Sequence, residues 1–128
     1  MHKSRLAAFV IDSQVSDIGP AAEFWGQALG LAVLPSDADW AERYAYLDVP
    51  GGDARLLIQK VEHASRIHLD IETDDRAAEV ARLEQLGARI VQAFPRWTVM
   101  EAPTGHRFCV VNPQRPDFAD ADDVNVWK

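Results

Sequence analysis

An internal repeat constrains the fold of this chain more than any other feature of the sequence. The segment AAEFWGQALGLAV, residues 21–33, aligns with AAEVARLEQLGARIV, residues 77–91. Each copy begins with Ala-Ala-Glu, continues as a helix that ends in Leu-Gly, and passes into a short strand. Because a sheet built from one copy could not bury its apolar face alone, we expect the two copies to form one structure.

The first copy contains a clearly marked helix. Asp17 is the expected N-cap, Pro20 suits the first turn, and Gly30 is the expected end of the helix. Apolar residues recur at helical spacing and predict an inward face made of Ala21, Phe24, Trp25, Ala28 and Leu29.

Strand-like segments lie on both sides of that helix. Residues 6–12, LAAFVID, form a short apolar run that is typical of a buried strand. Three further strands are predicted after the helix: LAVLP from residue 31, RYAYLDV from residue 43 and ARLLIQKV from residue 54. Turn residues at 36–37 and 50–52 separate them.

The second copy repeats this order of elements. RIHLDIE, from residue 66, alternates strictly, so His68, Asp70 and Glu72 should share one face of a strand. Asp74 or Asp75 can cap a helix that ends at Gly87, with an inner face of Ala77, Val80, Ala81 and Leu83. Strands are predicted over 88–94, 96–102 and 106–112, with a turn at 103–105. Each copy is therefore a βαβββ unit, and the fold class is α+β.

The charge and residue composition of the chain limits the kinds of partner and the cellular location that we expect. Thirteen basic residues against twenty acidic ones give a net charge of −7, which argues against nucleic acid and anionic membranes as partners. No apolar stretch reaches the roughly 18 residues of a membrane helix, and Asp12 interrupts the N-terminal apolar run too early for a signal peptide. The single cysteine, Cys109, fits a reducing cytoplasm. We expect a cytoplasmic protein.

The order of these elements resembles the vicinal oxygen chelate superfamily, which includes glyoxalase I, extradiol dioxygenases and bleomycin-resistance proteins. The segments that carry the resemblance are EFWGQALGLAVL, RIHLDIETDD and APTGHRFCVV, and the glyoxalase-like subgroup is the most similar. The resemblance implies two βαβββ modules, about 6–61 and 66–112, that form a cupped mixed sheet around one pocket, often in a homodimer. Residues 1–112 would form this domain and residues 113–128 an acidic tail.

In metal-dependent members of the superfamily, four strands each supply one ligand, usually His or Gln, Glu, His and Glu. Carried over to this chain, those positions are Val10, Gln59, His68 and Cys109, and only His68 is a standard match. If Asp12 takes the place of Val10, a metal site becomes more plausible. We therefore expect no cofactor, and the alternative is a divalent metal held by His68 with Gln59 and Cys109.

Strand alternation and the resemblance together define an expected ligand pocket. We expect Asp12 and Asp70 to occupy equivalent places in the two copies, and His68 to act as an acid–base group or as a hydrogen-bonding partner of the ligand. Aromatic residues near these strands could stack on a planar ligand. The expected pocket residues are Asp12, Gln59, His68, Asp70, Trp97, Arg107 and Cys109.

Three functions fit these residues. The first is a metal-independent protein that holds a small apolar or aromatic ligand in the concave sheet. The second is a lyase, isomerase or dioxygenase with a degenerate metal site or with His68 as the acid–base group. The third is a regulatory or interaction module with a vestigial pocket. We favour the first, because most expected metal ligands are missing while aromatic residues are abundant.

Overall fold

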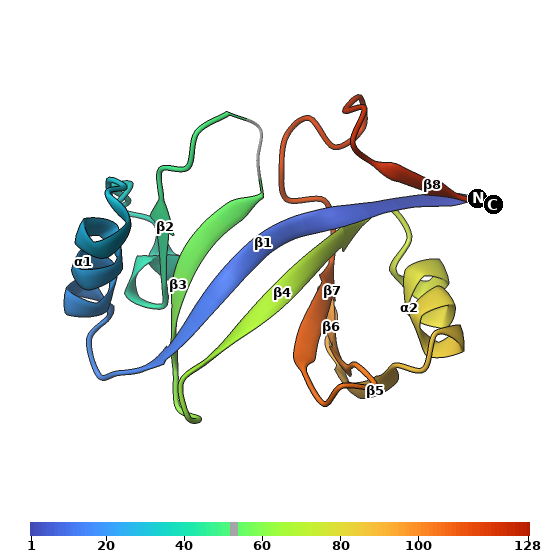
Figure 1. Ribbon diagram of the computed structural model, residues 1–128, viewed down its shortest axis with the longest axis horizontal. Helices are drawn as coiled ribbons and strands as arrows, with labels where there is room; N and C mark the ends of the chain where they lie inside the picture. Colours follow the sequence, from blue (N-terminus) through green and yellow to red (C-terminus); the bar gives the residue numbers. More distant parts are fainter. Residues whose placement is uncertain (52–53) are drawn as a thin grey trace. The chain divides into compact units, whose positions relative to one another are not determined.

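The computed structural model describes residues 1–51 and 54–128, which form two compact units (Figure 1). Unit 1 comprises Met1–Ala7 and His68–Lys128, and unit 2 comprises Ala8–Ile67. Gly52, in the predicted turn at 50–52, lies outside the described residues. The elements are β1 (His2–Gln14), α1 (Ile18–Leu29), the 3-10 helix η1 (Asp39–Glu42), β2 (Tyr44–Leu47), β3 (Arg55–Val61), β4 (Arg66–Thr73), α2 (Arg76–Gln85), β5 (Arg89–Ala93), β6 (Trp97–Glu101), β7 (Arg107–Val111) and β8 (Asn125–Trp127).

In unit 2 the strand order is β2-β3-β1, with β1 parallel to β3 and β2 antiparallel to β3. Helix α1 packs beside this sheet (Figure 1), and its buried core consists of Ile11, Ile18, Leu47 and Ile58. The alternate side chains of β1, β2 and β3 lie on the other face of the sheet and point away from α1. They form a second apolar cluster of Ala8, Val10 and Leu57, against which Tyr44 and Tyr46 pack.

Helix α1 begins and ends as predicted, but it turns a different face to the core. Asp17 accepts a hydrogen bond from the backbone N–H of Gly19, and Gly30 caps the other end with a positive φ of 69°. The buried residues of the helix are Ile18, Ala22 and Gly26; Trp25 and Ala21 pack partly buried against the core.

The prediction was therefore wrong for Phe24, Ala28 and Leu29, which are exposed; the exposed fraction of Phe24 is 62%. Gly26 explains the difference, because its missing side chain lets the helix approach residues 31–33 closely. A Cβ atom at Gly26 would lie 2.9 Å from the Leu31 carbonyl oxygen.

The strand predicted at LAVLP is absent, and only an isolated bridge joins Val33 to Leu47. The backbone N–H of Leu34 still donates to the Tyr46 carbonyl at 2.9 Å. The Asp48 N–H donates to the Ala32 carbonyl at 2.8 Å on the other side of the bridge, so this segment pairs with β2 through one bridge and its two flanking hydrogen bonds. The other predicted strands are present, and the first of them extends over His2–Gln14 rather than residues 6–12.

In unit 1 the strand order is β1-β4-β7-β6-β5, and β8 pairs antiparallel with the start of β1. Strands β4 and β7 are parallel, whereas β6 is antiparallel to both β7 and β5. Helix α2 buries Val80 and Leu83 against Met100 and Val110.

Asp75 is the N-cap of α2, as one of the two predicted alternatives. However, Ala77 and Ala81 are exposed, and the third buried residue of the helix is Glu79. Glu79 accepts hydrogen bonds from Arg82 of the same helix at 2.8 and 2.9 Å and from His2 of β1 at 2.8 Å, and the His2 contact joins that face of α2 to β1.

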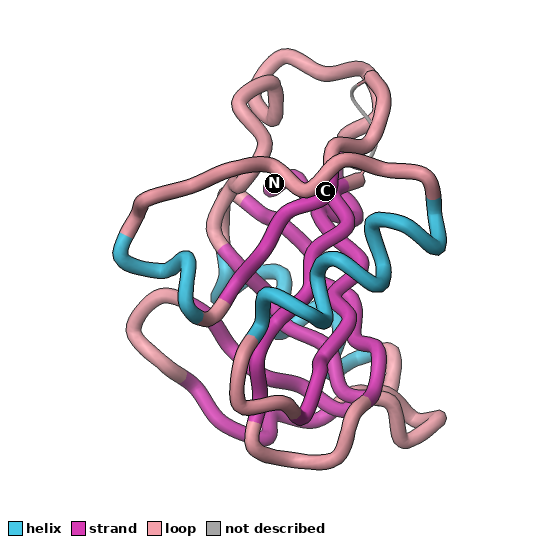
Figure 2. Tube along the Cα trace, turned by 90° about the vertical axis from the view of Figure 1, so that its left-hand side faces the viewer, coloured by secondary structure: helices cyan, strands magenta, loops and turns pink. Residues whose placement is uncertain are grey.

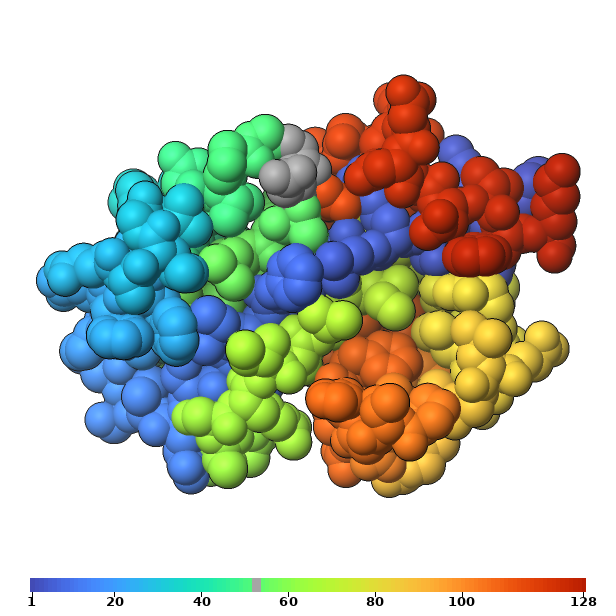
Figure 3. Space-filling model, in the orientation of Figure 1, coloured from blue at the N-terminus to red at the C-terminus, as the bar shows by residue number. Residues whose placement is uncertain are grey.

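Residues 113–128, which we call the C-terminal strap, pack against unit 1. Before β8 the strap is mostly turns and loop (Figure 2), and it lies on the surface beside the N-terminal residues (Figure 3). Phe118 is buried, and the Trp127 indole donates to the Ser4 hydroxyl at 2.8 Å while Arg82 stacks on its ring. Among the described residues, no helix has the length and apolar character needed to span a membrane.

Candidate functional site

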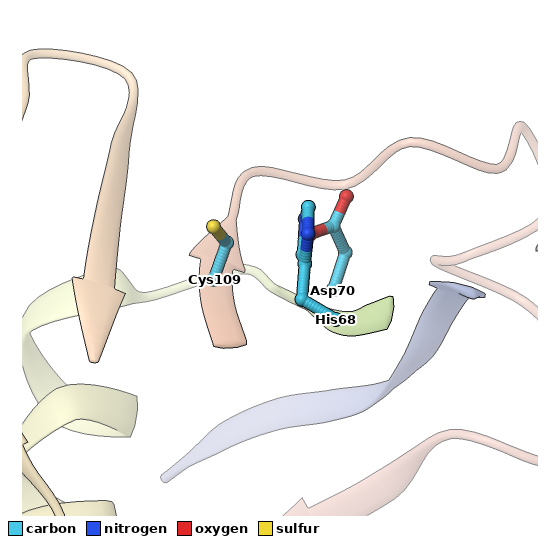
Figure 4. Close-up of side chains that lie close together, drawn as sticks. All are labelled: His68, Asp70 and Cys109. Carbon is cyan, nitrogen blue, oxygen red and sulfur yellow. The ribbon is translucent and has the colours of Figure 1, made fainter. Parts of the chain in front are cut away.

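The centre of the candidate site in unit 1 is formed by His68, Asp70 and Cys109. His68 and Asp70 extend from β4 and Cys109 from β7, on the same side of the sheet (Figure 4). The His68 Nε2 and Asp70 Oδ1 atoms are 3.2 Å apart, and one side-chain donor atom from each of the three residues lies within 4.8 Å of the others. The strand register explains this grouping, because Asp70 pairs with Cys109 in the β4–β7 ladder.

These residues belong to the sheet face that points away from α2, which we call the helix-free face of unit 1. The opposite side chains, including Met100 and Val110, pack under α2. Side chains on the helix-free face form rows that run across β4, β7 and β6. In order along β4, the strand alternation and register give three rows: His68, Arg107 and Glu101; Asp70, Cys109 and Val99; Glu72, Val111 and Trp97.

Two further predicted residues, Trp97 and Arg107, lie on this face. The Trp97 ring is partly exposed and stacks on Phe94 with ring centroids 4.5 Å apart. Arg107 lies 3.6 Å from Glu101, which also binds Arg89 through a 2.7 Å hydrogen bond. The five predicted residues of unit 1 therefore share one surface that offers hydrogen-bonding, charged and aromatic groups.

The remaining predicted residues, Asp12 and Gln59, belong to unit 2. They are register partners on β1 and β3, and Tyr44 on β2 pairs with Gln59 in the same row. The Gln59 amide donates a long 3.5 Å hydrogen bond to the Tyr44 hydroxyl. Val10, the position implied for a metal ligand, is buried in the neighbouring apolar row with Leu57.

Asp12 has basic neighbours that the sequence did not reveal. Its side chain is only 2% exposed and lies 3.8 Å from Arg66 Nε and 3.9 Å from His63 Nε2. His63 Nδ1 is 2.8 Å from the Ala64 carbonyl oxygen, which can only accept, so Nδ1 carries a proton. On the other side of the ring, Nε2 lies 3.3 Å from an Arg66 guanidinium nitrogen.

Glu72, at one end of the helix-free face of unit 1, is fully buried in a network of charges. Burial alone would raise the pKa of Glu72, but backbone N–H groups of Arg115 and Gln114 and the guanidinium groups of Arg5 and Arg115 lower it below its usual value. Alternation placed Glu72 on this face, but nothing in the sequence pointed to partners in β1 and in the strap.

A cavity of about 470 Å³ in unit 1 lies elsewhere, between the strap and the ends of β1 and β4. It contains none of the predicted site residues. Its walls are formed by Lys3, Asp74, Pro113, Gln114, Arg115, Pro116, Phe118 and Ala119.

The donor atoms of unit 1 are compatible with a divalent ion. Around a tetrahedral zinc ion with bonds of about 2.0–2.3 Å, ligand atoms lie roughly 3.3–3.8 Å apart. Imidazole, carboxylate and thiolate are all zinc ligands; the His68 and Asp70 atoms are 3.2 Å apart, and the donor atoms of all three residues lie within 4.8 Å of one another. Asp70 was not in the expected set of His68, Gln59 and Cys109. Gln59 belongs to unit 2.

Comparison with known protein families identifies the fold. The family model described as a glyoxalase-like domain matches residues 8–111, which is most of the chain. The chain belongs to the glyoxalase-like domain family. The expected α+β fold and the resemblance to the vicinal oxygen chelate superfamily are thereby confirmed. No match was found among curated proteins.

Solved structures of other proteins with this fold include an enzyme and a hypothetical protein. Methylmalonyl-CoA epimerase from Mycobacterium tuberculosis matches with a TM-score of 0.62 and 21% identity, covering 91% of each chain. A hypothetical protein from Bacillus halodurans C-125 matches with a TM-score of 0.62 and 13% identity over 88% of this chain and 96% of that chain.

A variant of Streptomyces coelicolor methylmalonyl-CoA epimerase in complex with 2-nitronate-propionyl-CoA has a TM-score of 0.61 and 19% identity. It covers 84% of this chain and 96% of that chain. At these identities the matches establish the fold alone.

Proposed function

We propose that this glyoxalase-like protein binds a small apolar or aromatic molecule without a metal, on the helix-free face of unit 1. The observation that carries the proposal is the composition of that face. Trp97 offers an aromatic surface on β6, and the His68–Asp70 pair offers hydrogen-bonding groups on β4, two strands away on the same face. Apolar contact supplies affinity in such sites and a few polar groups fix orientation.

The side chains at the implied metal positions of unit 2 support the metal-independent part of the proposal. Val10 has no ligand atom and is buried against apolar neighbours, and the Gln59 amide already donates to Tyr44. A neutral amide oxygen is also a weak ligand for a first-row metal compared with imidazole or thiolate.

A thermal-shift screen of planar aromatic compounds, with aliphatic compounds, α-keto acids and thiol adducts as comparison classes, tests the proposal. Planar aromatic compounds should raise the melting temperature. The Trp97→Ala substitution should lower the affinity for the best of these compounds about tenfold through loss of stacking. Phe9→Ala is the matched control, because Phe9 is an exposed aromatic residue on β1 in unit 2 and lies outside the proposed dimer surface. A screen with no aromatic binder, or equal loss in both variants, would argue against the proposal.

An enzyme is the second candidate, and the spacing of His68, Asp70 and Cys109 favours it. A divalent ion bound by these three residues would act as a Lewis acid. Without metal, Asp70 would orient the His68 ring, which suits a group that moves a proton to or from a bound substrate. Metal content of the purified protein separates the metal-dependent form of this candidate from the binding protein.

We also propose that the protein acts in the cytoplasm as a homodimer and does not bind nucleic acid. The net charge of −7 supports the last point. Exposed apolar side chains in unit 2 support the dimer, which a molar-mass measurement in solution tests. They are Phe24, Leu29, Val33, Leu34 and Trp40.

A further inference from the structure

The helix-free face of unit 1 is partly exposed at the middle of β4 but covered at one end. Asp70 and Glu72 point to the same side of β4, yet the Asp70 side chain is 21% exposed and the Glu72 side chain is completely buried. Two residues of a strand span about 7 Å, so the surface changes from accessible to covered within about that distance.

The C-terminal strap provides that cover. Backbone N–H groups of Gln114 and Arg115 donate to Glu72 Oε1 at 2.7 and 3.0 Å, and Arg115 Nε donates to Oε2 at 3.1 Å. Arg5 Nε donates to the same Oε2 at 2.8 Å. The strap therefore begins on top of the Glu72 carboxylate and is joined to it by both backbone and side chain.

A second set of contacts holds the strap farther along its length. The two remaining guanidinium nitrogens of Arg5 bind Asp117 at 2.7 Å and Asp123 at 2.5 Å. The Arg5 side chain is buried, whereas those of Asp117 and Asp123 are 54% and 61% exposed. Solvent screening makes these outer contacts weaker than the buried Glu72 contacts.

We propose that the C-terminal strap is the end wall of the ligand site, and that Asp117 and Asp123 keep it closed through Arg5. A ligand that contacts His68 and Asp70 could then extend only about 7 Å along β4, roughly the length of one aromatic ring, before it meets the strap. The inference rests on the proposed function, because it assumes that the helix-free face of unit 1 is where a ligand binds.

Cys109 offers a direct test of the wall that needs no ligand. It is the only cysteine in the chain, and it lies in the Asp70 row, next to the row that contains the covered Glu72. Alkylation rates of Cys109 are measured with N-methylmaleimide and with the much larger fluorescein-5-maleimide. Each rate is divided by the rate for the same protein unfolded in urea, so that the ratio reports access alone.

The strap is loosened in the full chain by the double substitution Asp117→Asn and Asp123→Asn. The matched control is Asp120→Asn with Asp122→Asn, which removes the same charge from the strap but spares the carboxylates that bind Arg5. Hydrogen exchange at the amides of Gln114 and Arg115 reports whether the strap has loosened. A chain ending at Asn112 supplies a third comparison if circular dichroism shows that it folds.

We expect amide exchange in the strap and labelling of Cys109 by the large maleimide to increase together. In the Asp117/Asp123 variant the strap amides should exchange about three- to tenfold faster, and the normalised rate for the large maleimide should rise by a similar factor. The small maleimide and the control variant should change little.

Faster amide exchange without faster labelling by the large maleimide would overturn the end wall. Unchanged exchange would overturn the role of Asp117 and Asp123. Neither result depends on a ligand, so failure of the strap and failure of the proposed function are distinguishable.

Discussion

At the scale of single residues, unit 1 is unusual for its buried charges. Glu72 and Glu79 are both completely buried, and each is paired with arginine. An unpaired buried carboxylate would be very costly, so each depends on partners that are remote in the sequence. Glu79 is bound by His2, which is 77 positions away. For this reason the helical pattern predicted apolar Ala77 and Ala81 on the inner face of α2, and missed Glu79.

Glu79 should make the stability of the protein depend on acid. Burial alone would raise its pKa, but hydrogen bonds from Arg82, His2 and Ser4 outweigh burial and lower the pKa to about 2. A lowered pKa contributes stability that is present above the unfolded-state value of 4.5 and is lost as the pH falls toward 2. Glu79→Gln should remove this contribution, roughly 2–3 kcal/mol, and flatten the pH dependence between these values.

Urea unfolding of both proteins at several pH values between 2 and 7 provides the measurement. Glu84→Gln, an exposed change on the same helix, is the control. If the free-energy difference between wild type and Glu79→Gln were the same at low and neutral pH, the paired Glu79 carboxylate would not be the source of the acid sensitivity.

At the scale of elements, local signals predicted helix ends and strand positions better than helix faces. Asp17, Asp75 and Gly30 act as caps because capping depends on neighbouring residues only. Which face of α1 is buried depends instead on its contact with residues 31–33. The strand predicted at LAVLP is reduced to one bridge between Val33 and Leu47, because strand pairing depends on a partner, β2, that is distant along the chain.

Gly26→Ala tests this explanation of the α1 orientation. Helix propensity alone predicts a gain of about 1 kcal/mol from alanine. However, the new Cβ would lie 2.9 Å from the Leu31 carbonyl oxygen and 3.2 Å from a Val33 methyl group. We therefore expect a net destabilisation of about 1–2 kcal/mol by thermal or urea unfolding. Gln27→Ala, its exposed neighbour, should be neutral or stabilising. A Gly26→Ala protein more stable than wild type would show that no close approach at Gly26 sets the helix face.

At the scale of the whole molecule, the order of elements and its resemblance to the vicinal oxygen chelate superfamily predicted the α+β fold and the superfamily, although one strand of the first βαβββ unit is reduced to a bridge. The site was predictable in part. Strand alternation placed His68, Asp70, Arg107 and Cys109 on one face, which agrees with the strand register of unit 1, because a period of two needs no knowledge of distant residues. Trp97 was expected near them only as one of several aromatic residues beside the strands. The grouping of Asp70 with Cys109, and the strap over Glu72, depend on strand register and on chain ends that meet only in the folded protein.

The central claim is that the helix-free face of unit 1 binds its ligand without metal. Isothermal titration of the best aromatic binder, before and after dialysis against a chelator, tests it most directly when combined with elemental analysis. We expect substoichiometric metal, an unchanged Kd and melting temperature after chelation, and weaker binding by His68→Ala and Trp97→Ala. About one zinc, nickel, manganese or iron per chain, with binding lost on its removal, would contradict the account.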